Sequence, residues 1–270
     1  MPDALVPDGA VFPVSRFYEW ECERLLRAQR RDVRWYRRLA GESGGPILEL
    51  GSGAGRVSID LAKSGWEVVG LDNQPYLVAR ARANAEIDGV AARTRFVSGD
   101  MRAFALARLF PLVILPFNTL GYLLTDEEVL ACFRCVMAHL PPGGIFGFQV
   151  RPFELGEPNA PRGFVASGPC EDGQLEMYES VTVEPRSHIS HYDEEYRLLR
   201  PGRPAVTFRQ RLTLRSFYRE EVESLLRAAG FRVRAVHGDF DGRPYPRPAR
   251  PEWPMLLEAV PAGGTATRWP

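Results

Sequence analysis

The chain has 270 residues, of which 45% are hydrophobic and 25% are charged. This composition is typical of a globular protein and excludes a disordered chain. The length allows one large domain, or one domain that carries a sizeable insertion. Lys and Arg together number 34, as do Asp and Glu, so the formal net charge is zero. A bulk attraction to nucleic acid or to an anionic membrane is therefore not expected.

The sequence also favours a cytoplasmic protein. No apolar run approaches the roughly 20 residues that span a bilayer. Residues 1–4 (MPDA) lack the basic and apolar regions that begin a secretory signal. The cysteines are too few and too scattered for a disulfide framework: Cys22, Cys132, Cys135 and Cys170.

Residues 1–40 are predicted to form an N-terminal arm and a lid helix. The first dozen residues are rich in Pro and Gly, and apolar residues then recur at helical spacing from residue 15 to about residue 40. Arginines line another face of this helix and could bind nucleic acid. The glutamates just upstream favour ion pairing instead, so we expect an ordinary solvated helix face.

Residues 41–150 alternate between short apolar strands and helices. The expected strands are 46–50, 66–71, 94–97, 110–115 and 145–150, and the expected helices are 57–63, 75–87 and a helix that Asp126 caps and that ends near residue 140. Such alternation predicts an α/β fold with a parallel sheet covered by helices on both faces.

The alternation stops at residues 151–205, where Pro, Gly and short alternating segments predict antiparallel strands inserted as a flap. It resumes over residues 206–260, which we expect to complete the core sheet with strands 206–214, 231–236 and 255–260 and a helix over 220–229. Residues 261–270 are expected to be a disordered tail.

The most specific motif is ELGSGAGR at residues 49–56, between the first strand and the first core helix. Its glycines allow a tight turn and let a ligand approach the backbone. The helix that follows offers free N–H groups. Dinucleotides and S-adenosylmethionine both bind such loops.

The spacing of the small residues in this motif distinguishes the two ligand classes. A dinucleotide motif needs a third small residue five positions after Gly51, where this chain has Arg56. Glu49 also suits a cationic ligand better than a pyrophosphate. Asp72, at the end of the second strand, suits ribose hydroxyls in either class. Asp100 suits an adenine amino group, and Met101 can lie against the ring.

In these motifs the chain resembles class I S-adenosylmethionine-dependent methyltransferases. The resembling segments are ELGSGAG (49–55), VGLD (69–72), GDM (99–101), LVILPFN (112–118) and LPPGG (140–144). FYE (17–19), FNTLGY (117–122) and the stretch 214–231 resemble the branch that acts on small molecules, including amino-sugar and glycine or sarcosine N-methyltransferases. Two positions depart from the family, Pro111 and Glu19, where aspartate is usual or frequent.

The resemblance implies a Rossmann-like, seven-stranded, mostly parallel sheet with one antiparallel hairpin, an N-terminal helical lid and an antiparallel flap over the substrate. It implies S-adenosylmethionine as the methyl donor, S-adenosylhomocysteine as the product, and no metal. The expected cofactor-binding residues are Glu49, Gly51, Ser52, Gly53, Gly55, Arg56, Asp72, Asn73, Asp100, Met101, Pro116 and Phe117.

The acceptor site is less defined by the sequence. An amine acceptor must arrive neutral, whereas a hydroxyl acceptor usually needs a base. Candidate catalytic residues are Tyr18 on the lid, Asn118 after the fourth strand and His191 on the flap. Candidate substrate-binding residues are Tyr122, Arg151, Tyr178, His188 and Arg215. His139 and His237 are expected to have structural roles, and Cys132 and Cys135 are expected to be helix residues rather than metal ligands.

We therefore expect a methyltransferase, monomeric or homodimeric, that acts on a small-molecule acceptor, most simply an amine nitrogen. An O-methyltransferase with a flap histidine as base is the alternative. A nicotinamide-dependent oxidoreductase and a non-catalytic cofactor-binding module also stay open. A nucleic-acid methyltransferase fits less well, because Leu115-Pro116-Phe117-Asn118 stands where an Asp- or Asn-Pro-Pro-aromatic signature would be.

Overall fold

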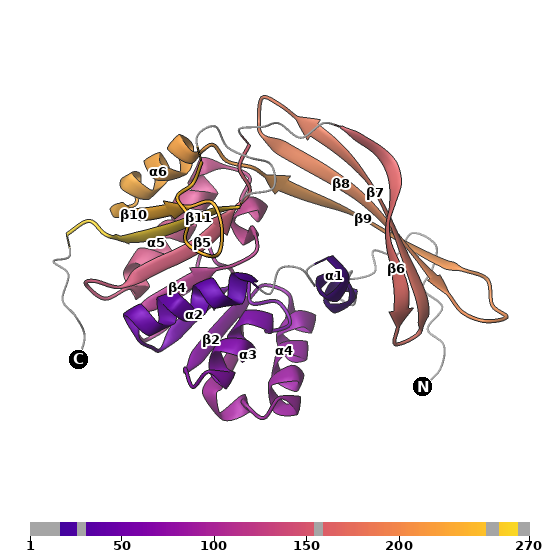
Figure 1. The fold of residues 1–270 in the computed structure, drawn as a ribbon, viewed down its shortest axis with the longest axis horizontal. Coiled ribbons are helices and arrows are strands. Elements are labelled where there is room, and N and C mark those ends of the chain that lie inside the picture. Colours follow the sequence, from indigo (N-terminus) through magenta and orange to yellow (C-terminus); the bar gives the residue numbers. More distant parts are fainter. Residues whose placement is uncertain (1–16, 26–30, 154–158, 247–253, 264–270) are drawn as a thin grey trace. The chain divides into compact units, whose positions relative to one another are not determined.

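The computed structural model describes residues 17–25, 31–153, 159–246 and 254–263 (Figure 1). The chain divides into two compact units. The described parts of residues 1–28 and 156–214 form the smaller unit, and those of residues 29–155 and 215–270 form the larger one. Each unit has its own sheet.

The larger unit contains a seven-stranded sheet in the order β10-β11-β5-β4-β1-β2-β3. Its strands are β1 Ile47–Leu50, β2 Val68–Asp72, β3 Thr94–Ser98, β4 Leu112–Leu115, β5 Ile145–Val150, β10 Phe231–His237 and β11 Met255–Pro261. β11 runs antiparallel to both of its neighbours, and the pairs from β5 through β3 are parallel. The prediction of a Rossmann-like, mostly parallel sheet with one antiparallel hairpin is confirmed.

Helices cover both faces of this sheet. The helices α2 (Arg31–Ser43), α3 (Arg56–Lys63) and α4 (Pro75–Ile87) supply the buried side chains of one face. The helices α5 (Asp126–His139) and α6 (Arg219–Ala228) supply those of the other. Two short 3₁₀ helices, η2 (Ala91–Arg93) and η3 (Thr119–Tyr122), lie in the loops before β3 and after β4.

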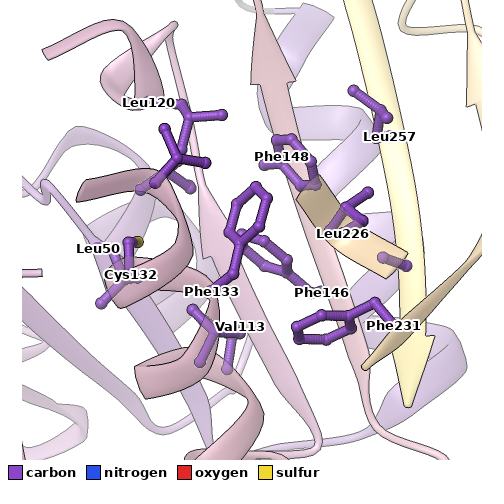
Figure 2. Packing of buried hydrophobic residues seen from close by; sticks show 14 of the residues in the cluster. Leu50, Val113, Leu120, Cys132, Phe133, Phe146, Phe148, Leu226, Phe231 and Leu257 are labelled. Carbon is purple, nitrogen blue, oxygen red and sulfur yellow. The ribbon is translucent and has the colours of Figure 1, made fainter. Parts of the chain in front are cut away.

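The α5 and α6 face holds an aromatic core (Figure 2). Phe133 of α5 has its ring centroid 5.7 Å from that of Phe146 and 5.8 Å from that of Phe148. Phe231 of β10 lies 6.4 Å from Phe133. Buried aromatic side chains contribute large apolar areas, so this cluster fixes α5 and the loop before it against the sheet.

Thr125 caps the N-terminus of helix α5, and the helix begins at Asp126. The Thr125 hydroxyl accepts the N–H of Glu128, and the Glu128 carboxylate accepts the N–H of Thr125. This reciprocal pair is a capping box. The prediction that Asp126 caps the helix was wrong, because Asp126 is its first helical residue.

The smaller unit contains a second sheet, in the order β6-β7-β8-β9, together with helix α1 (Tyr18–Leu25). The strands are β6 Ala160–Cys170, β7 Gly173–Glu184, β8 Ile189–Leu199 and β9 Val206–Arg215. The inserted antiparallel strands are thus present. The strand at 206–214, however, belongs to this sheet and not to the core sheet, where we had expected it.

The described residues of the N-terminal segment are helical over α1 (Tyr18–Leu25) and α2 (Arg31–Ser43). α1 groups with the second sheet and α2 with the core, and residues 26–30 lie outside the described part. The predicted loose arm also lies outside it. At the other end, strand β11 continues through Pro261, one residue into the segment expected to be disordered.

Candidate cofactor-binding site and relation to known proteins

The carboxyl ends of β1, β2 and β4 meet at one edge of the core sheet. β1 pairs with β2 on one side and with β4 on the other, so the order of the chain reverses at this point. In open α/β sheets, ligands bind in the crevice outside the strand ends at such a reversal. The glycine loop after β1 lies at this edge.

Three glycines give the loop its shape. Gly51, Gly53 and Gly55 have φ values of +63°, +53° and +88°, in the left-handed region that favours glycine. Gly55 is the residue before α3 and so places the free N–H groups of that helix at the loop. The predicted position of the loop between a strand and a helix N-terminus is confirmed.

Asp72, the last residue of β2, holds the loop from the side. One carboxylate oxygen, Oδ2, accepts the N–H of Gly53 at 2.8 Å, and Oδ1 accepts the N–H of Gln74 at 2.9 Å. Burial raises the pKa of Asp72, and these two backbone donors oppose that effect. Its carboxylate therefore lies beside the glycine loop, at the strand end where a ribose would be bound.

Glu49 lies beneath the loop on the face covered by α2 and α3. It is 2% exposed, and the Ser58 hydroxyl donates a hydrogen bond to its Oε2. Burial raises the pKa of Glu49 to about 8, while Ser58 and Arg56 act in the opposite direction. The carboxyl group therefore holds its proton more strongly than an ordinary glutamate does.

Arg56, which begins α3, faces α2. Its Nη1 and Nη2 atoms bind Asp32 Oδ1 and Oδ2 at 3.0 and 2.5 Å. Asp32 is almost fully buried. A bidentate Arg–carboxylate pair fixes the orientation of the guanidinium group, so α2 and the start of α3 are tied together directly behind the glycine loop.

Asp100 follows β3 but is engaged by a neighbour. The Nε, Nη2 and backbone N–H groups of Arg102 all donate to its carboxylate, and Arg102 Nη1 also binds Glu128. These hydrogen bonds hold the pKa of Asp100 below its usual range. An adenine amino group at this position would share the carboxylate with Arg102.

The loop after β4 has an unusual backbone. Phe117 and Asn118 have φ values of +54° and +58°, a conformation that costs free energy in residues other than glycine and clusters at functional sites. Asn118 Oδ1 accepts the N–H of Arg151 at 2.8 Å, which ties this loop to the end of β5. Pro116 is buried, whereas the Phe117 ring is partly exposed at the edge.

The remaining predicted residues of the core unit differ in exposure. Met101 packs against the core beside α5. Asn73 and Tyr122 are exposed. Arg215 is buried and its guanidinium group binds both Asp126, at 2.7 Å, and Glu221. A substrate carboxylate at Arg215 would have to compete with these two side chains.

His191 lies on β8 within the second sheet. Its Nε2 atom is 2.9 Å from Glu184 Oε1, and its Nδ1 atom is 3.1 Å from Thr213 Oγ1. Both ring nitrogens thus have partners. His188 lies in the turn before β8 with φ +57°. The Cζ atoms of Arg162 and Arg197 lie 4.5 and 4.7 Å from the ring centroid of Tyr178 on β7.

The second sheet separates His191 from helix α1. Alternate side chains of a strand point to opposite faces, so His191 and Tyr196 lie on opposite faces of β8. Phe17, just before α1, stacks on Tyr196 with ring centroids 5.3 Å apart. Helix α1, which carries Tyr18, therefore covers the face opposite to His191, and the structure does not bring these two predicted catalytic residues together.

The other histidines have structural partners, as expected. His139 Nδ1 binds the carbonyl of Cys135 at 2.7 Å, and Nε2 accepts the N–H of Leu106 at 2.8 Å. His237 binds Glu258 at 2.8 Å, which raises the pKa of His237. Within the described ranges, no group of three or more His, Cys, Asp or Glu side chains could hold a metal ion. No helix there is long and apolar enough to cross a membrane.

The fold and the glycine loop together define a Rossmann-like protein that binds a nucleoside-containing ligand at the carboxyl edge of its sheet. Residues 47–144 match a methyltransferase domain family. Over 203 residues the chain is 30% identical to dTDP-3-amino-3,6-dideoxy-alpha-D-glucopyranose N,N-dimethyltransferase from Streptomyces fradiae, covering 73% of this chain and 74% of that protein. The chain belongs to the S-adenosylmethionine-dependent methyltransferases.

Two solved structures share the fold. The CcbJ methyltransferase from Streptomyces caelestis is 25% identical with a TM-score of 0.72, over 86% of this chain and 90% of that one. The S-adenosylmethionine-bound CalS10, an amino pentose methyltransferase from Micromonospora echinaspora, is 22% identical with a TM-score of 0.68, over 90% of this chain and 96% of that one. The predictions of a methyltransferase and of S-adenosylmethionine as its cofactor are therefore confirmed.

The residues at the edge fit this cofactor. The Ser52 hydroxyl is buried in the glycine loop and has no hydrogen-bond partner among the described residues, so a ligand can supply one. Glu49 lies beneath the same loop and Asp72 beside it. An acidic site of this kind suits the ammonium and the ribose hydroxyls of S-adenosylmethionine better than it suits a pyrophosphate.

Sequence reasoning missed several residues that shape the site. Asp32 and Arg102 bind predicted cofactor residues, and Thr119 packs against Gly51. No signal in the sequence marked Asp32 as the partner of Arg56.

Proposed function

We propose that this enzyme transfers a methyl group to the amino nitrogen of a small-molecule acceptor, with an amino sugar as the leading acceptor class. The observation that carries this proposal is the 30% identity, over nearly three quarters of both chains, to an enzyme whose name gives an amino sugar as its substrate. Neither a nucleic-acid nor a membrane partner is part of the proposal.

The cofactor would be held at the carboxyl edge of the core sheet. We assign its ribose to Asp72, its methionine ammonium to Glu49, and its adenine to Asp100 with Met101. Gly51, Ser52, Gly53 and Gly55 would form the floor, with Arg56 behind them, and Asn73, Pro116 and Phe117 would line the rim. The exposed fraction of the Phe117 ring favours a role against a ligand.

Bound S-adenosylmethionine supplies a methyl group on a sulfonium that leaves as a neutral thioether. The acceptor nitrogen uses its lone pair to form the new C–N bond, and the methylated ammonium then loses a proton to water. The task of this chain's residues is to align the two reactants, which can supply roughly 7–11 kcal/mol of the barrier reduction.

The geometry around His191 favours a nitrogen acceptor over a hydroxyl. A hydroxyl acceptor needs a base with a free nitrogen, whereas Glu184 and Thr213 engage both nitrogens of His191. A neutral amine needs no such base. His191 as a base for O-methylation is therefore the second candidate and requires the release of one of these partners.

The acceptor residues stay proposals. Asn118 would position the acceptor from the loop after β4, and Tyr18 would do so from α1. Tyr122, Arg151, Tyr178, His188 and Arg215 would contribute further contacts. In the domain organisation that we propose, the described parts of residues 1–28 and 156–214 contribute acceptor-binding side chains, and those of residues 29–155 and 215–270 bind the cofactor. The assembly would be a monomer or a homodimer.

Calorimetric titration tests the cofactor half of this proposal. S-Adenosylmethionine and S-adenosylhomocysteine should bind, and NADH should give no heat. Binding of NADH alone would contradict the assignment and favour an oxidoreductase.

Mass spectrometry tests the acceptor half. A dTDP-3-amino sugar should gain one or two methyl groups, and its 3-hydroxy counterpart should gain none. Methylation of only the hydroxy sugar would favour the O-methyltransferase, with His191→Phe as the decisive variant. Normal cofactor binding without turnover of any amine, hydroxyl or carbon acceptor would favour a non-catalytic module.

A further inference from the structure

Five polar side chains gather beneath the glycine loop. Asp32 and Tyr36 come from α2, Glu49 from β1, and Arg56 and Ser58 from α3. All except Arg56 are almost fully buried. Buried polar and charged groups are costly unless they are paired, so the arrangement of their partners decides how this cluster behaves.

The cluster contains one ion pair, and both of its charges act on the carboxyl group of Glu49. Asp32 and Arg56 form a bidentate pair. Burial is the main cause that raises the pKa of Glu49 to about 8. The cation of Arg56 lowers this pKa, and the anion of Asp32 raises it. Glu49 therefore responds to both members of the pair, with opposite sign.

Glu49 is also tied to helix α3 through its own hydrogen bond. Ser58 of α3 donates to Glu49 Oε2, and a donor of this kind stabilises the ionised form of a carboxyl group. Arg56 lies two residues before Ser58 on α3 and binds Asp32 of α2. The charged or titratable groups that these two helices contribute to the cluster are thus Arg56 on α3, and Asp32 and Tyr36 on α2.

We propose that Asp32 and Arg56 are positioning residues that act through Glu49, setting the pH range over which the enzyme binds the ammonium group of its cofactor. This inference rests on the proposed role of Glu49 as the ammonium contact. An ionised Glu49 attracts the ammonium, and a protonated Glu49 does not. The ion pair behind the loop therefore selects the form of Glu49 that the cofactor meets.

Tyr36 provides a matched control within the same cluster. Its side chain is fully buried, and its hydroxyl has no hydrogen-bond partner among the described residues. Tyr36→Phe removes a polar atom from the cluster without removing a charge. The change should leave the ionisation of Glu49 almost unaltered, and the loss of an unpaired buried hydroxyl costs little.

The test is the affinity for S-adenosylhomocysteine between pH 5.5 and 9.5, measured by calorimetry on the full chain. The wild-type affinity should rise with pH as Glu49 ionises and fall again as the ligand's own amino group loses its proton. That second limb belongs to the ligand, so it should be the same for every variant. The midpoint of the acidic limb reports on the protein.

The two members of the ion pair should shift this midpoint in opposite directions. Arg56→Gln should move it to higher pH and weaken binding at pH 6.5 by about three- to tenfold, since one pKa unit is a factor of ten. Asp32→Asn should move it to lower pH and strengthen binding at pH 6.5 by a similar factor. A purely structural role would give shifts of the same sign, or none, and would overturn the proposal.

5′-Methylthioadenosine separates this inference from the proposed cofactor site. It keeps the adenosine but lacks the amino-acid moiety, so its affinity should show no acidic limb in any variant. If 5′-methylthioadenosine lost affinity in Asp72→Ala and in none of the other variants, the assignment of the ribose to Asp72 would be supported. If Glu49→Gln kept the acidic limb for S-adenosylhomocysteine, the assignment of Glu49 itself would be wrong, and the role of the ion pair would fall with it.

Discussion

Thr119 fills the space beside Gly51. A Cβ atom at Gly51 would lie 2.3 Å from Thr119 Cγ2 and 3.1 Å from its Oγ1. The Thr119 hydroxyl is itself held by the carbonyl of Pro116 at 2.7 Å. The loop after β4 therefore packs directly on the glycine loop after β1, and the two loops form one surface at the carboxyl edge of the sheet.

Gly51→Ala should disrupt this contact and weaken cofactor binding. The new methyl group collides with Thr119, which costs about 1–3 kcal/mol for overpacking, and φ of +63° adds about 1–2 kcal/mol for a residue with a Cβ. Urea unfolding would measure the loss of stability, and calorimetry with S-adenosylhomocysteine would measure the loss of cofactor affinity.

Thr119→Ser removes Cγ2 and retains the hydroxyl. Combined with Gly51→Ala, it should restore the part of the stability lost to the collision and leave the backbone cost of about 1–2 kcal/mol. Thr119→Ser alone is the control. If Gly51→Ala alone and the double variant lost the same free energy of unfolding, the collision would contribute nothing.

Asp72→Ala should weaken the binding of S-adenosylmethionine by about 1.5–3 kcal/mol, the range for a hydrogen bond to a charged group. It also removes the acceptor for Gly53 N–H, so Asp72→Asn, which retains one oxygen, should lose less. Asp88→Ala removes a half-exposed carboxylate paired with Lys63 and serves as the control. Unchanged affinity in Asp72→Ala would show that the ribose binds elsewhere.

The core of the site could be predicted because its signals are local in the sequence. The glycines, Glu49 and Asp72 each stand at a fixed distance from the end of a strand, and strand ends are visible in the apolar pattern. The parallel sheet then brings those ends to one edge without further information. No pairing between distant segments had to be known.

The partners of these residues could not be predicted in the same way. Arg56 binds Asp32, 24 positions away, and which of the acidic residues on the N-terminal helix would face it depends on how α2 packs. Similarly, Glu184 and Thr213 meet His191 only because of the register of β7, β8 and β9. A strand pattern gives the face of each residue and not its partner.

The strand β9 shows another limit. Its sequence alternates like that of a half-buried strand, and such a strand fits an antiparallel sheet in either unit. It joins β8, whose Glu194 binds Gln210, instead of the core sheet. Membership of a sheet is decided by long-range packing that alternation does not encode.

Asn118→Ala should lower both stability and catalytic efficiency. The change removes the acceptor for Arg151 N–H and leaves a β-carbon residue at φ +58°, where Asn is better tolerated than Ala. The combined loss should be about 1–2 kcal/mol. Urea unfolding gives the stability, and kcat/KM with an amino-sugar acceptor gives the catalytic effect.

Two other substitutions separate the roles of Asn118. Asn118→Gly keeps the backbone conformation and removes the side chain. It should therefore relieve the backbone strain, but it should not restore the hydrogen bond to Arg151 N–H. Asn118→Asp retains an oxygen acceptor and should recover that link. If Asn118→Asp is stable yet lacks activity, the side-chain amide acts on the acceptor, as we propose. Full activity in Asn118→Gly would exclude a catalytic role.

We expect Glu21 to make the stability of the protein depend on pH. Burial against the second sheet raises the pKa of Glu21 to about 9, and the charges of Glu194 and Glu179 add to this effect. Its Oε1 atom has no hydrogen-bond partner in the described part of the chain. Between its ordinary value and about 9 the folded state binds more protons than the unfolded state, so the free energy of unfolding falls as the pH rises through that window.

Glu21→Gln should therefore stabilise the protein relative to wild type increasingly from pH 5.5 to pH 9, by on the order of a few kcal/mol at the upper end. Urea unfolding of the full chain at several pH values measures this difference. Glu127→Gln removes the same charge from an exposed position on α5 and should give a difference that does not change with pH. If the Glu21→Gln difference is equally flat, Glu21 is ionised in the folded protein at neutral pH, and the carboxylates of the second sheet must be stabilised by a cation.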